Sequence, residues 1–475
     1  MIPNTSMNPF KDSSEIRTTT APIPPVTRPP GNRAYAVIHW SFMGLIALIV
    51  FAENIAPRIL PVPRPAGFRL VIAAMICMNV LWWSVADRRF ARYVRSARAS
   101  AALRMFVAVF SIALNTPLIY MIVAGRFPAF INTAPTWYAA AVTIWQLGLI
   151  IVMPVVACIR ILLLSVISLA RWFGWNMTGG APPASDKDIN LHRRAILKTA
   201  FGSVPMLVLA GGTSFAQVQS RRLQVNRHQV TCPWLPPRLR GLTITQVSDL
   251  HVGRLYRPEM LPYLVDQVNR LNSDILVLTG DIVDISNDML PPALEAISQM
   301  HHRHGAFACI GNHDEFDNRA EFIRAVRKRL PLLIDERRTL DIGGERLTLA
   351  GIDWARFDQQ TGGRSGHQQH VINALAGHEL ARDGPIIALA HHPHAWDSLA
   401  LQAVPLVLSG HTHGGQVMLN APDIRPDIGA GAMLFRYVRG FYQKPDSTLF
   451  VNRGVGNWFP VRINSPAEIV QLQLV

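Results

Sequence analysis

The pattern of hydrophobic and polar positions divides the 475-residue chain into two halves. Before about residue 220, apolar residues form long runs with few charges. After it, short β-branched runs alternate with polar clusters and with segments of helical apolar spacing. The short runs (LTITQVS, DILVLT, AFACI, PIIALA and VPLVLS) predict buried strands, and segments 258–272, 288–302 and 317–330 predict helices. Residues 225–475 are therefore predicted to form an α/β domain, with RLTLAGID and TLFVNRG as added strands.

The first half contains four apolar spans, near residues 35–55, 68–87, 102–124 and 138–170. Each is long enough to cross a hydrocarbon core, which needs about 20 helical residues. We expect a four-span transmembrane region over residues 34–172, preceded by a disordered cytoplasmic tail over residues 1–33 that is rich in Pro, Thr and Ser. Burial of these helices in a soluble all-α domain is the alternative, but four long, weakly charged spans are hard to bury together.

The charge balance supports the membrane interpretation. The chain has 46 Lys and Arg against 31 Asp and Glu, a net charge of +15, which in a soluble protein would suggest nucleic acid. The excess lies beside the apolar spans, in segments 88–104 and 171–199, so it indicates membrane orientation and no nucleic-acid partner. The positive-inside rule places the tail and these two segments in the cytoplasm. The four cysteines form no CxxC pair, which argues against a zinc ribbon or a disulfide framework.

A fifth crossing is expected at residues 200–216, after a cytoplasmic linker over residues 173–199. Arg193 and Arg194, followed by Lys198 and a modest apolar run, resemble a twin-arginine export signal placed internally. The alternative is that these residues are ordinary positive charges before a fifth span. The two interpretations differ only in the export machinery used. Both interpretations leave the run as an anchor and place the second half on the periplasmic side of a multi-pass inner-membrane protein.

Five polar clusters follow the predicted strands of the second half. They contain Asp, His and Asn but no Cys, a mixture that suits Mn, Fe or Zn better than a thiolate site. Polar ligands at strand ends lie on loops held by a rigid sheet, where α/β folds place their chemistry. The clusters are Asp249-Leu-His251, Gly280-Asp281, Gly311-Asn312-His313-Asp314, His391-His392-Pro393 and Gly410-His411-Thr-His413.

This series of motifs resembles the calcineurin-like metallophosphoesterases, and the phrases QVSDLHVG, VLTGDIVD and SGHTHGGQV are similar to the bacterial membrane-associated branch. The resemblance covers about residues 225–475. It implies a four-layer αββα sandwich and a centre that binds two divalent metal ions, of which Mn, Fe, Zn and Ni all remain open.

The resemblance also implies the role of each residue. Asp281 would bridge both ions; Asp249, His251 and His413 would complete one site, and Asn312, His391 and His411 the other. His391 is preferred to His392 because the family motif reads His-x-Pro. His313 would contact the substrate phosphate and stabilise or protonate the leaving oxygen, and Asp314 would orient His313 or, alternatively, only cap the following helix.

Three functions are compatible with these observations. The leading hypothesis is a membrane-anchored, metal-dependent phosphoric ester hydrolase that cleaves phosphate esters or pyrophosphates with metal-activated water, acting on a lipid-linked or envelope substrate. A pyrophosphatase of the UDP-diacylglucosamine type, from lipid A metabolism, is the enzymatic alternative and would favour a cytoplasmic domain. The third is a non-catalytic membrane receptor with a vestigial metal site, which the intact set of ligand residues argues against.

Overall fold

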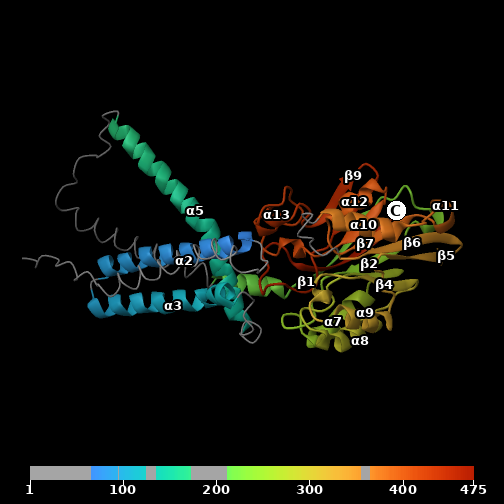
Figure 1. The fold of residues 1–475 in the computed structure, drawn as a ribbon, viewed down its shortest axis with the longest axis horizontal. Coiled ribbons are helices and arrows are strands. Elements are labelled where there is room, and N and C mark those ends of the chain that lie inside the picture. The colour runs from blue at the N-terminus through green and yellow to red at the C-terminus, as the bar shows by residue number, and fades with distance from the viewer. Residues whose placement is uncertain (1–65, 95, 125–134, 173–210, 355–363) are drawn as a thin grey trace, which may run out of the picture. The chain divides into compact units, whose positions relative to one another are not determined.

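The computed structural model describes residues 66–94, 96–124, 135–172, 211–354 and 364–475. Residues 223–475, called the α/β domain below, carry two mixed β-sheets (Figure 1). The first sheet has the strand order β1-β11-β2-β3-β4. Its parallel trio β2, β3 and β4 is joined to β1 through β11, which runs antiparallel to β2. Their bounds are β1 Leu223–Val230, β2 Thr243–Val247, β3 Ile275–Thr279, β4 Gly305–Cys309 and β11 Ala467–Leu474.

The second sheet has the order β5-β6-β7-β8-β10-β9. Strands β6, β7, β8 and β10 are parallel, and the edge strands β5 and β9 are antiparallel to their neighbours. Parallel strands that are covered on both faces are expected to be continuously apolar, as β7 and β8 are. Their bounds are β5 Glu336–Ile342, β6 Glu345–Ile352, β7 Ile386–Ala390, β8 Leu406–Ser409, β9 Gly440–Lys444 and β10 Ser447–Val451.

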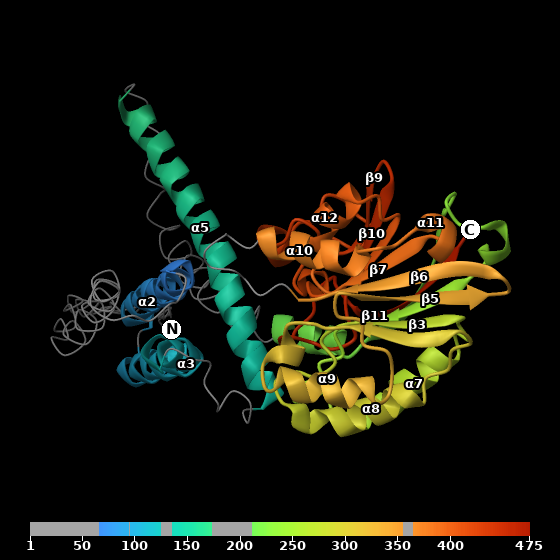
Figure 2. The same ribbon diagram turned by 45° about the vertical axis from the view of Figure 1, so that its right-hand side comes forward.

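Alternation along the strands divides the hydrophobic core into three layers. In β3, Ile275 and Val277 face the second sheet, whereas Leu276 and Leu278 face helices, because successive side chains point to opposite faces. Helices α7, α8 and α9 cover the first sheet, and α10 and α12 cover the second (Figure 2). The helices are α7 Leu261–Asn269, α8 Leu290–Ser298, α9 Arg319–Arg327, α10 Arg364–Leu375, α11 Leu380–Asp383, α12 Ala395–Leu401 and α13 Ala430–Leu434.

The seven predicted strand runs coincide with β2, β3, β4, β6, β7, β8 and β10, and the three predicted helical segments contain α7, α8 and α9. Four strands were not predicted: β1, β5, β9 and β11. The omission matters most for β11, since it connects β1 to the parallel trio of the first sheet. The mixed α/β class is therefore confirmed.

The N-terminal half contains the long helices α2 (Ala66–Tyr93), α3 (Ala97–Ala124) and α5 (Thr136–Trp172). They coincide with the second, third and fourth predicted spans. In the part of the chain that the structure describes, only the segment Ala97–Tyr120 is long and apolar enough to cross a membrane by length and composition. The first predicted span, most of the fifth, the tail and the linker lie outside the described residues, so the structure does not support the full multi-span region.

Candidate metal centre

The five polar clusters lie directly after the carboxyl ends of β2, β3, β4, β7 and β8. The first three strands are parallel within one sheet and the last two within the other. Parallel strands end at one edge of their sheet, where α/β folds place ligand-binding loops. The close contacts described below show that the loops of the two sheets meet at a single centre.

The backbone turns sharply at most of the predicted ligands. Five of the seven have φ in the left-handed region, which non-glycine residues rarely adopt. Such strained conformations persist only where the surrounding structure holds them, and they concentrate at functional sites. The φ values are 51° at Asp249, 46° at His251, 54° at Asp281, 71° at His411 and 50° at His413.

Two glycines allow the loops to approach one another. A Cβ at Gly311 would overlap the carboxylate and backbone nitrogen of Asp281, and one at Gly410 would overlap the carboxylate of Asp249. Both glycines immediately precede predicted ligands, so the close approach that brings the clusters together requires a residue without a side chain.

The first donor group, called site 1, consists of Asp249, His251 and His413, which are almost fully buried. The Nε2 atoms of His251 and His413 lie 3.0 Å apart. The His413 Nε2 lies 3.4 Å from Asp249 Oδ1, and the His251 Nε2 lies 3.4 Å from Asp281 Oδ2. Ring nitrogens and carboxylate oxygens that converge in this way are the donor set of a borderline divalent cation.

The second donor group, called site 2, consists of Asn312, His391 and His411. The Asn312 Oδ1 lies 3.2 Å from His391 Nε2 and 2.9 Å from His411 Nδ1. The His391 Nε2 also lies 3.1 Å from Asp281 Oδ2, the oxygen that faces His251 in site 1. One carboxylate oxygen therefore stands between the two groups, as a bridging ligand must.

The charges of the centre fit divalent cations. Asp249 and Asp281 are at most 1% exposed, and within the described residues neither pairs with Lys or Arg. Burial alone would raise the pKa of Asp281, but the charges of His391 and His251 and a hydrogen bond with His391 hold it well below its usual range. Burial, with the charge of His391, lowers the pKa of His411 to about 3, which favours the neutral ring that metals bind. Asp249 and Asp281 are buried carboxylates that no Lys or Arg balances among the described residues, and such groups call for a cation, so the residues fit two ions.

His313 lies beside site 1, with its ring 4.4 Å from that of His251, but its partner differs from the expectation. Its Nδ1 lies 2.6 Å from the backbone oxygen of Asp284 and 3.5 Å from the Asp284 carboxylate. Burial would lower the pKa of His313, but its hydrogen bonds with Asp284 and the charge of Asp281 raise it. Hydrogen bonds from His251 and His313 overcome burial and lower the pKa of Asp284 to about 2. The backbone oxygen of Asp284 therefore orients His313, and the Asp284 carboxylate lies beside the same ring nitrogen.

Asp314, to which sequence analysis gave that role, binds backbone amides instead. Its carboxylate accepts hydrogen bonds from the N–H groups of Asp281, Ile282, Val283 and Gly311, at 2.8–3.3 Å. The expected contact with His313 is absent because the chain turns at Asp281 and brings these N–H groups to Asp314. Asp314 fixes the loop that presents the bridging carboxylate, and it is neither the partner of His313 nor the N-cap of α9, which is Asn318.

Two further residues were missed. Arg462 is fully buried and donates to the backbone oxygens of Ser465, Arg453 and Gly456, and its Nη2 lies 3.4 Å from His413 Nδ1. Trp354 follows β6, and its ring lies 5.6 Å from His391, 5.3 Å from His392 and 5.0 Å from His411. No local motif marks either residue, because both act through chain segments distant in sequence.

Comparison with known proteins agrees with this geometry. The family model described as calcineurin-like phosphoesterase matches residues 242–415, which contain all seven predicted metal ligands. The chain carries a calcineurin-like metallophosphoesterase domain. The match begins at β2 and ends just after His413, so β1, β9, β10 and β11 lie beyond the matched segment although they complete the same sheets.

Several curated proteins resemble the metallophosphoesterase domain. A transmembrane protein with metallophosphoesterase domain from Danio rerio is 34% identical over 254 residues, which cover 50% of this chain and 54% of that protein. An uncharacterized metallophosphoesterase of Helicobacter pylori is 31% identical, over 49% of this chain and 60% of that protein. The UDP-2,3-diacylglucosamine pyrophosphatase LpxG of Chlamydia trachomatis is 28% identical, over 52% of this chain and 88% of that protein. The chain thus spans only about half of the length of the first relative.

One further cluster of potential ligands occurs among the described residues, formed by Asp335, Asp353 and His370. His370 Nδ1 lies 2.6 Å from Asp335 Oδ2, and Arg319 pairs with Asp353 at 2.7 Å. Arg319 balances one carboxylate of this cluster, whereas no Lys or Arg among the described residues pairs with Asp249 or Asp281 in the metal centre.

Proposed function

We propose that the protein is a two-metal phosphoesterase that hydrolyses phosphate esters or pyrophosphates. The observation that carries this proposal is the position of Asp281 Oδ2, which lies 3.4 Å from His251 Nε2 and 3.1 Å from His391 Nε2. A carboxylate shared by two His/Asp/Asn groups suits a pair of divalent ions, which would neutralise the phosphate and lower the pKa of the attacking water.

The residues of the chain have distinct tasks in this reaction. Asp249, His251 and His413 would hold one ion, and Asn312, His391 and His411 the other, with Asp281 between them. His313 is positioned by Asp284 and has a raised pKa, so it can donate a proton from Nε2 to the leaving oxygen at neutral pH. Asp314 holds the Asp281 loop in register through four backbone N–H groups and takes no part in proton transfer.

The test uses the full-length chain, stripped with a chelator and then given Mn²⁺, Zn²⁺, Fe²⁺ or Ni²⁺ separately. We expect hydrolysis of bis(p-nitrophenyl) phosphate or p-nitrophenyl phosphate to return with at least one metal, at about two ions per chain by elemental analysis. A protein that binds no metal, or that binds two ions and cleaves neither ester nor a pyrophosphate, would favour the receptor hypothesis.

A pyrophosphatase activity is the second candidate, and the likeness to the Chlamydia trachomatis pyrophosphatase favours it. The same metal centre could attack a phosphoanhydride, since a second phosphate is a better leaving group than an alcohol. Release of UMP from UDP-2,3-diacylglucosamine in detergent would support this candidate. Cleavage of simple diesters with no release of UMP would support the general phosphoesterase.

Membrane anchoring is the third part of the proposal, with the substrate lipid-linked or part of the cell envelope. Helix α3 leaves Met105, Phe106, Val109 and Ile112 more than half exposed, as a lipid-facing surface would be. Two curated relatives are named transmembrane proteins. A phosphatase reporter fused after residue 475 should be active if the domain is periplasmic, and replacing Arg193 and Arg194 with Lys should block export if the twin-arginine machinery is used. An inactive reporter would place the domain in the cytoplasm.

A further inference from the structure

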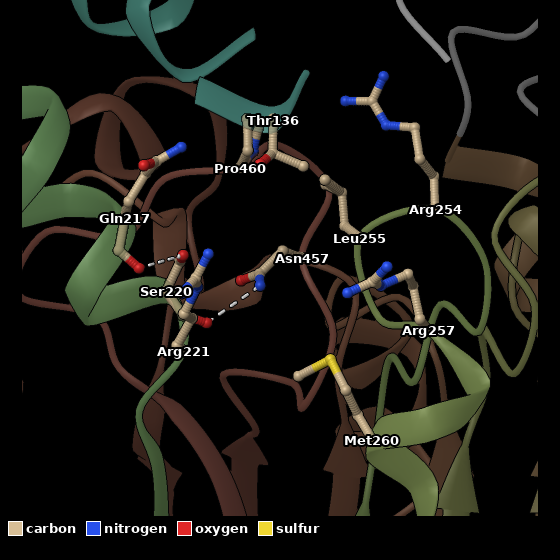
Figure 3. A pocket seen from close by; sticks show the side chains of 10 residues that line it. All are labelled: Thr136, Gln217, Ser220, Arg221, Arg254, Leu255, Arg257, Met260, Asn457 and Pro460. Atoms are coloured by element: carbon tan, nitrogen blue, oxygen red, sulfur yellow. Dashed lines mark hydrogen bonds between the residues drawn. The ribbon is translucent and has the colours of Figure 1, made fainter. Parts of the chain in front are cut away.

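A pocket lined by three arginines lies beside the metal centre. It has a volume of about 570 Å³, within the range of small-molecule sites, and Figure 3 shows its residues. Gln217, Ser220 and Arg221 line one side, with Arg254, Leu255, Arg257 and Met260 opposite and Asn457 and Pro460 between them. Thr136 also lines the pocket. Among the residues that the structure describes, the lining contains three cationic side chains and no acidic one.

The guanidinium groups have little negative charge to balance them. Arg254 Nη1 is buried and makes no hydrogen bond with any described residue, although a buried donor is costly to leave unpaired. Burial lowers the pKa of Arg254, and the charge of Asp284 opposes this shift without forming an ion pair within 4.0 Å among the described residues. Arg257 lies 3.9 Å from Glu259, but both side chains are more than 70% exposed, so this pair contributes little. The pocket is therefore positive and suited to an anion.

Two loops connect the pocket to the catalytic residues. Arg254 follows His251 by three residues, so their Cα atoms are at most about 11 Å apart. Between them, Gly253 lies against Asp284, where an added Cβ would contact the Asp284 Cβ at 2.8 Å. Asp284 is the residue that positions His313, so the arginine-bearing loop packs against the partner of the proposed proton donor.

The segment that contains Asn457, between the two sides of the pocket, is tied to site 1. The backbone N–H groups of Val455 and Gly456 donate to the oxygens of Ser248 and Asp249. Asn457 comes next: its Oδ1 accepts from Arg462 at 2.5 Å and its Nδ2 donates to the Ser220 oxygen at 3.2 Å. A ligand in this pocket would therefore have a fixed position relative to a phosphate held at the metal centre.

We propose that the pocket formed by Arg221, Arg254 and Arg257, called the arginine pocket, binds a second phosphate group of the substrate. This inference rests on the proposed function and adds its substrate class: molecules that carry a phosphate besides the one under attack. Guanidinium groups bind phosphate oxygens through charge-assisted, often bidentate hydrogen bonds. The apolar side chains of Leu255, Met260 and Pro460 leave room for the organic part of the molecule.

The kinetic test compares two substrates with the same scissile bond, thymidine 5′-(p-nitrophenyl phosphate) and its 3′-phosphorylated form. Arg254→Gln should lower kcat/KM for the 3′-phosphorylated form about 10- to 100-fold, mainly through KM, and change the other less than threefold. Arg240→Gln is the matched control, because it removes the same charge from an exposed site outside the pocket and should affect neither substrate. Equal losses on both substrates, or no loss on either, would overturn the proposal.

A binding measurement keeps the inference separate from the proposed function. Inorganic pyrophosphate is titrated calorimetrically into the chelator-treated chain. Wild type and Arg240→Gln should bind it, and Arg254→Gln should bind it at least tenfold more weakly. Equal binding of pyrophosphate by all three proteins would contradict phosphate binding in the arginine pocket, even if the enzyme is active. If no metal restores hydrolysis but the binding difference is present, the proposed function fails and the anion site stands.

Competition experiments identify the source of the phosphate. Glycerol 3-phosphate and dihexanoyl phosphatidic acid, the latter below its micellar concentration, compete with pyrophosphate for the same protein. If either compound displaces pyrophosphate from wild type but not from Arg254→Gln, the result supports phosphate binding in the arginine pocket. Stronger displacement by the lipid than by glycerol 3-phosphate assigns the phosphate to a lipid headgroup. Displacement by neither contradicts a phosphate-bearing substrate.

Discussion

The two halves of the metal centre, site 1 and site 2, are held in place by different interactions. Site 1 is enclosed: Asp249, His251 and His413 are at most 3% exposed. Behind His413, the fully buried Arg462 donates to surrounding backbone oxygens and fixes the 453–465 loop. Site 2 is more open, since Asn312 and His411 are partly exposed. Its histidines pack against the Trp354 ring, and His391 Nδ1 also hydrogen-bonds to the backbone oxygen of Thr279 at 2.7 Å.

This difference indicates that the two sites should hold their ions with different affinity. Ligands held by a dense hydrogen-bond network have little freedom to adjust, so site 1 should retain its ion tightly. Ligands beside solvent and an aromatic ring can accommodate exchange, so site 2 should lose its ion first on dilution or chelation. The predictions below separate the two sites, in order of decreasing effect.

Asp281→Asn should have the largest effect because Asp281 serves both sites. The amide keeps the shape but loses the charge that two cations share, so we expect at least one ion to be lost and hydrolysis to fall about 10³-fold or more. Elemental analysis and initial rates measure the two effects. A variant that keeps two ions and the wild-type rate would remove the basis for a shared bridge.

His313→Ala should lower kcat about 10²- to 10⁴-fold while both ions stay bound, because His313 is assigned to proton transfer and is no ligand. Loss of an ion from this variant would show that His313 had been misassigned.

Asp284→Asn tests the partner of His313 through the pH profile. Asp284 raises the pKa of His313, and the proposed proton transfer requires the protonated ring. Activity is therefore lost as pH rises through that pKa, and removing the Asp284 charge should move this alkaline limb to lower pH. Asp314→Asn is the contrasting variant: it weakens the amide contacts of the Asp281 loop, so it should lower metal content without moving the limb. If Asp314→Asn moves the alkaline limb and Asp284→Asn does not, Asp314 is the residue that orients His313, as the sequence analysis expected.

These residues also show where sequence reasoning succeeds. Each ligand cluster follows a short apolar strand, and both signals are local, so the strands and all the candidate ligands could be located before the structure was known. The partner of His313 could not be identified from the sequence, because its identity depends on the path of the chain after Asp281, where φ is 54°. Arg462 is 49 residues from His413, and no periodicity reports such a contact. Strand β11 carries polar residues between its apolar ones and gave no comparable signal.

Arg462→Lys should weaken site 1 alone. Lysine keeps the charge but cannot reproduce the planar fork that holds the backbone oxygens, so we expect about 10- to 100-fold weaker binding of one ion and a lower Tm. Arg439→Lys is the matched control: Arg439 is also buried and bound to backbone oxygens, but at Asn464, Asn420 and Ala421. Both variants should be less stable, and metal titration should distinguish them. Equal loss of metal from both would mean that destabilisation alone explains the effect.

Trp354→Ala should have the smallest effect and should be confined to site 2. The ring contacts His391 and His411 at 5.6 and 5.0 Å and is itself only partly buried, so it lies at the exposed edge of site 2. Aromatic contacts contribute about 0.5–1.5 kcal/mol beyond burial, which corresponds to a two- to tenfold lower kcat/KM. Trp354→Phe should recover most of this loss because it keeps a ring. If Trp354→Ala instead releases the site 1 ion, the two halves of the centre are not independent, and the contrast between a rigid site and an adaptable one fails.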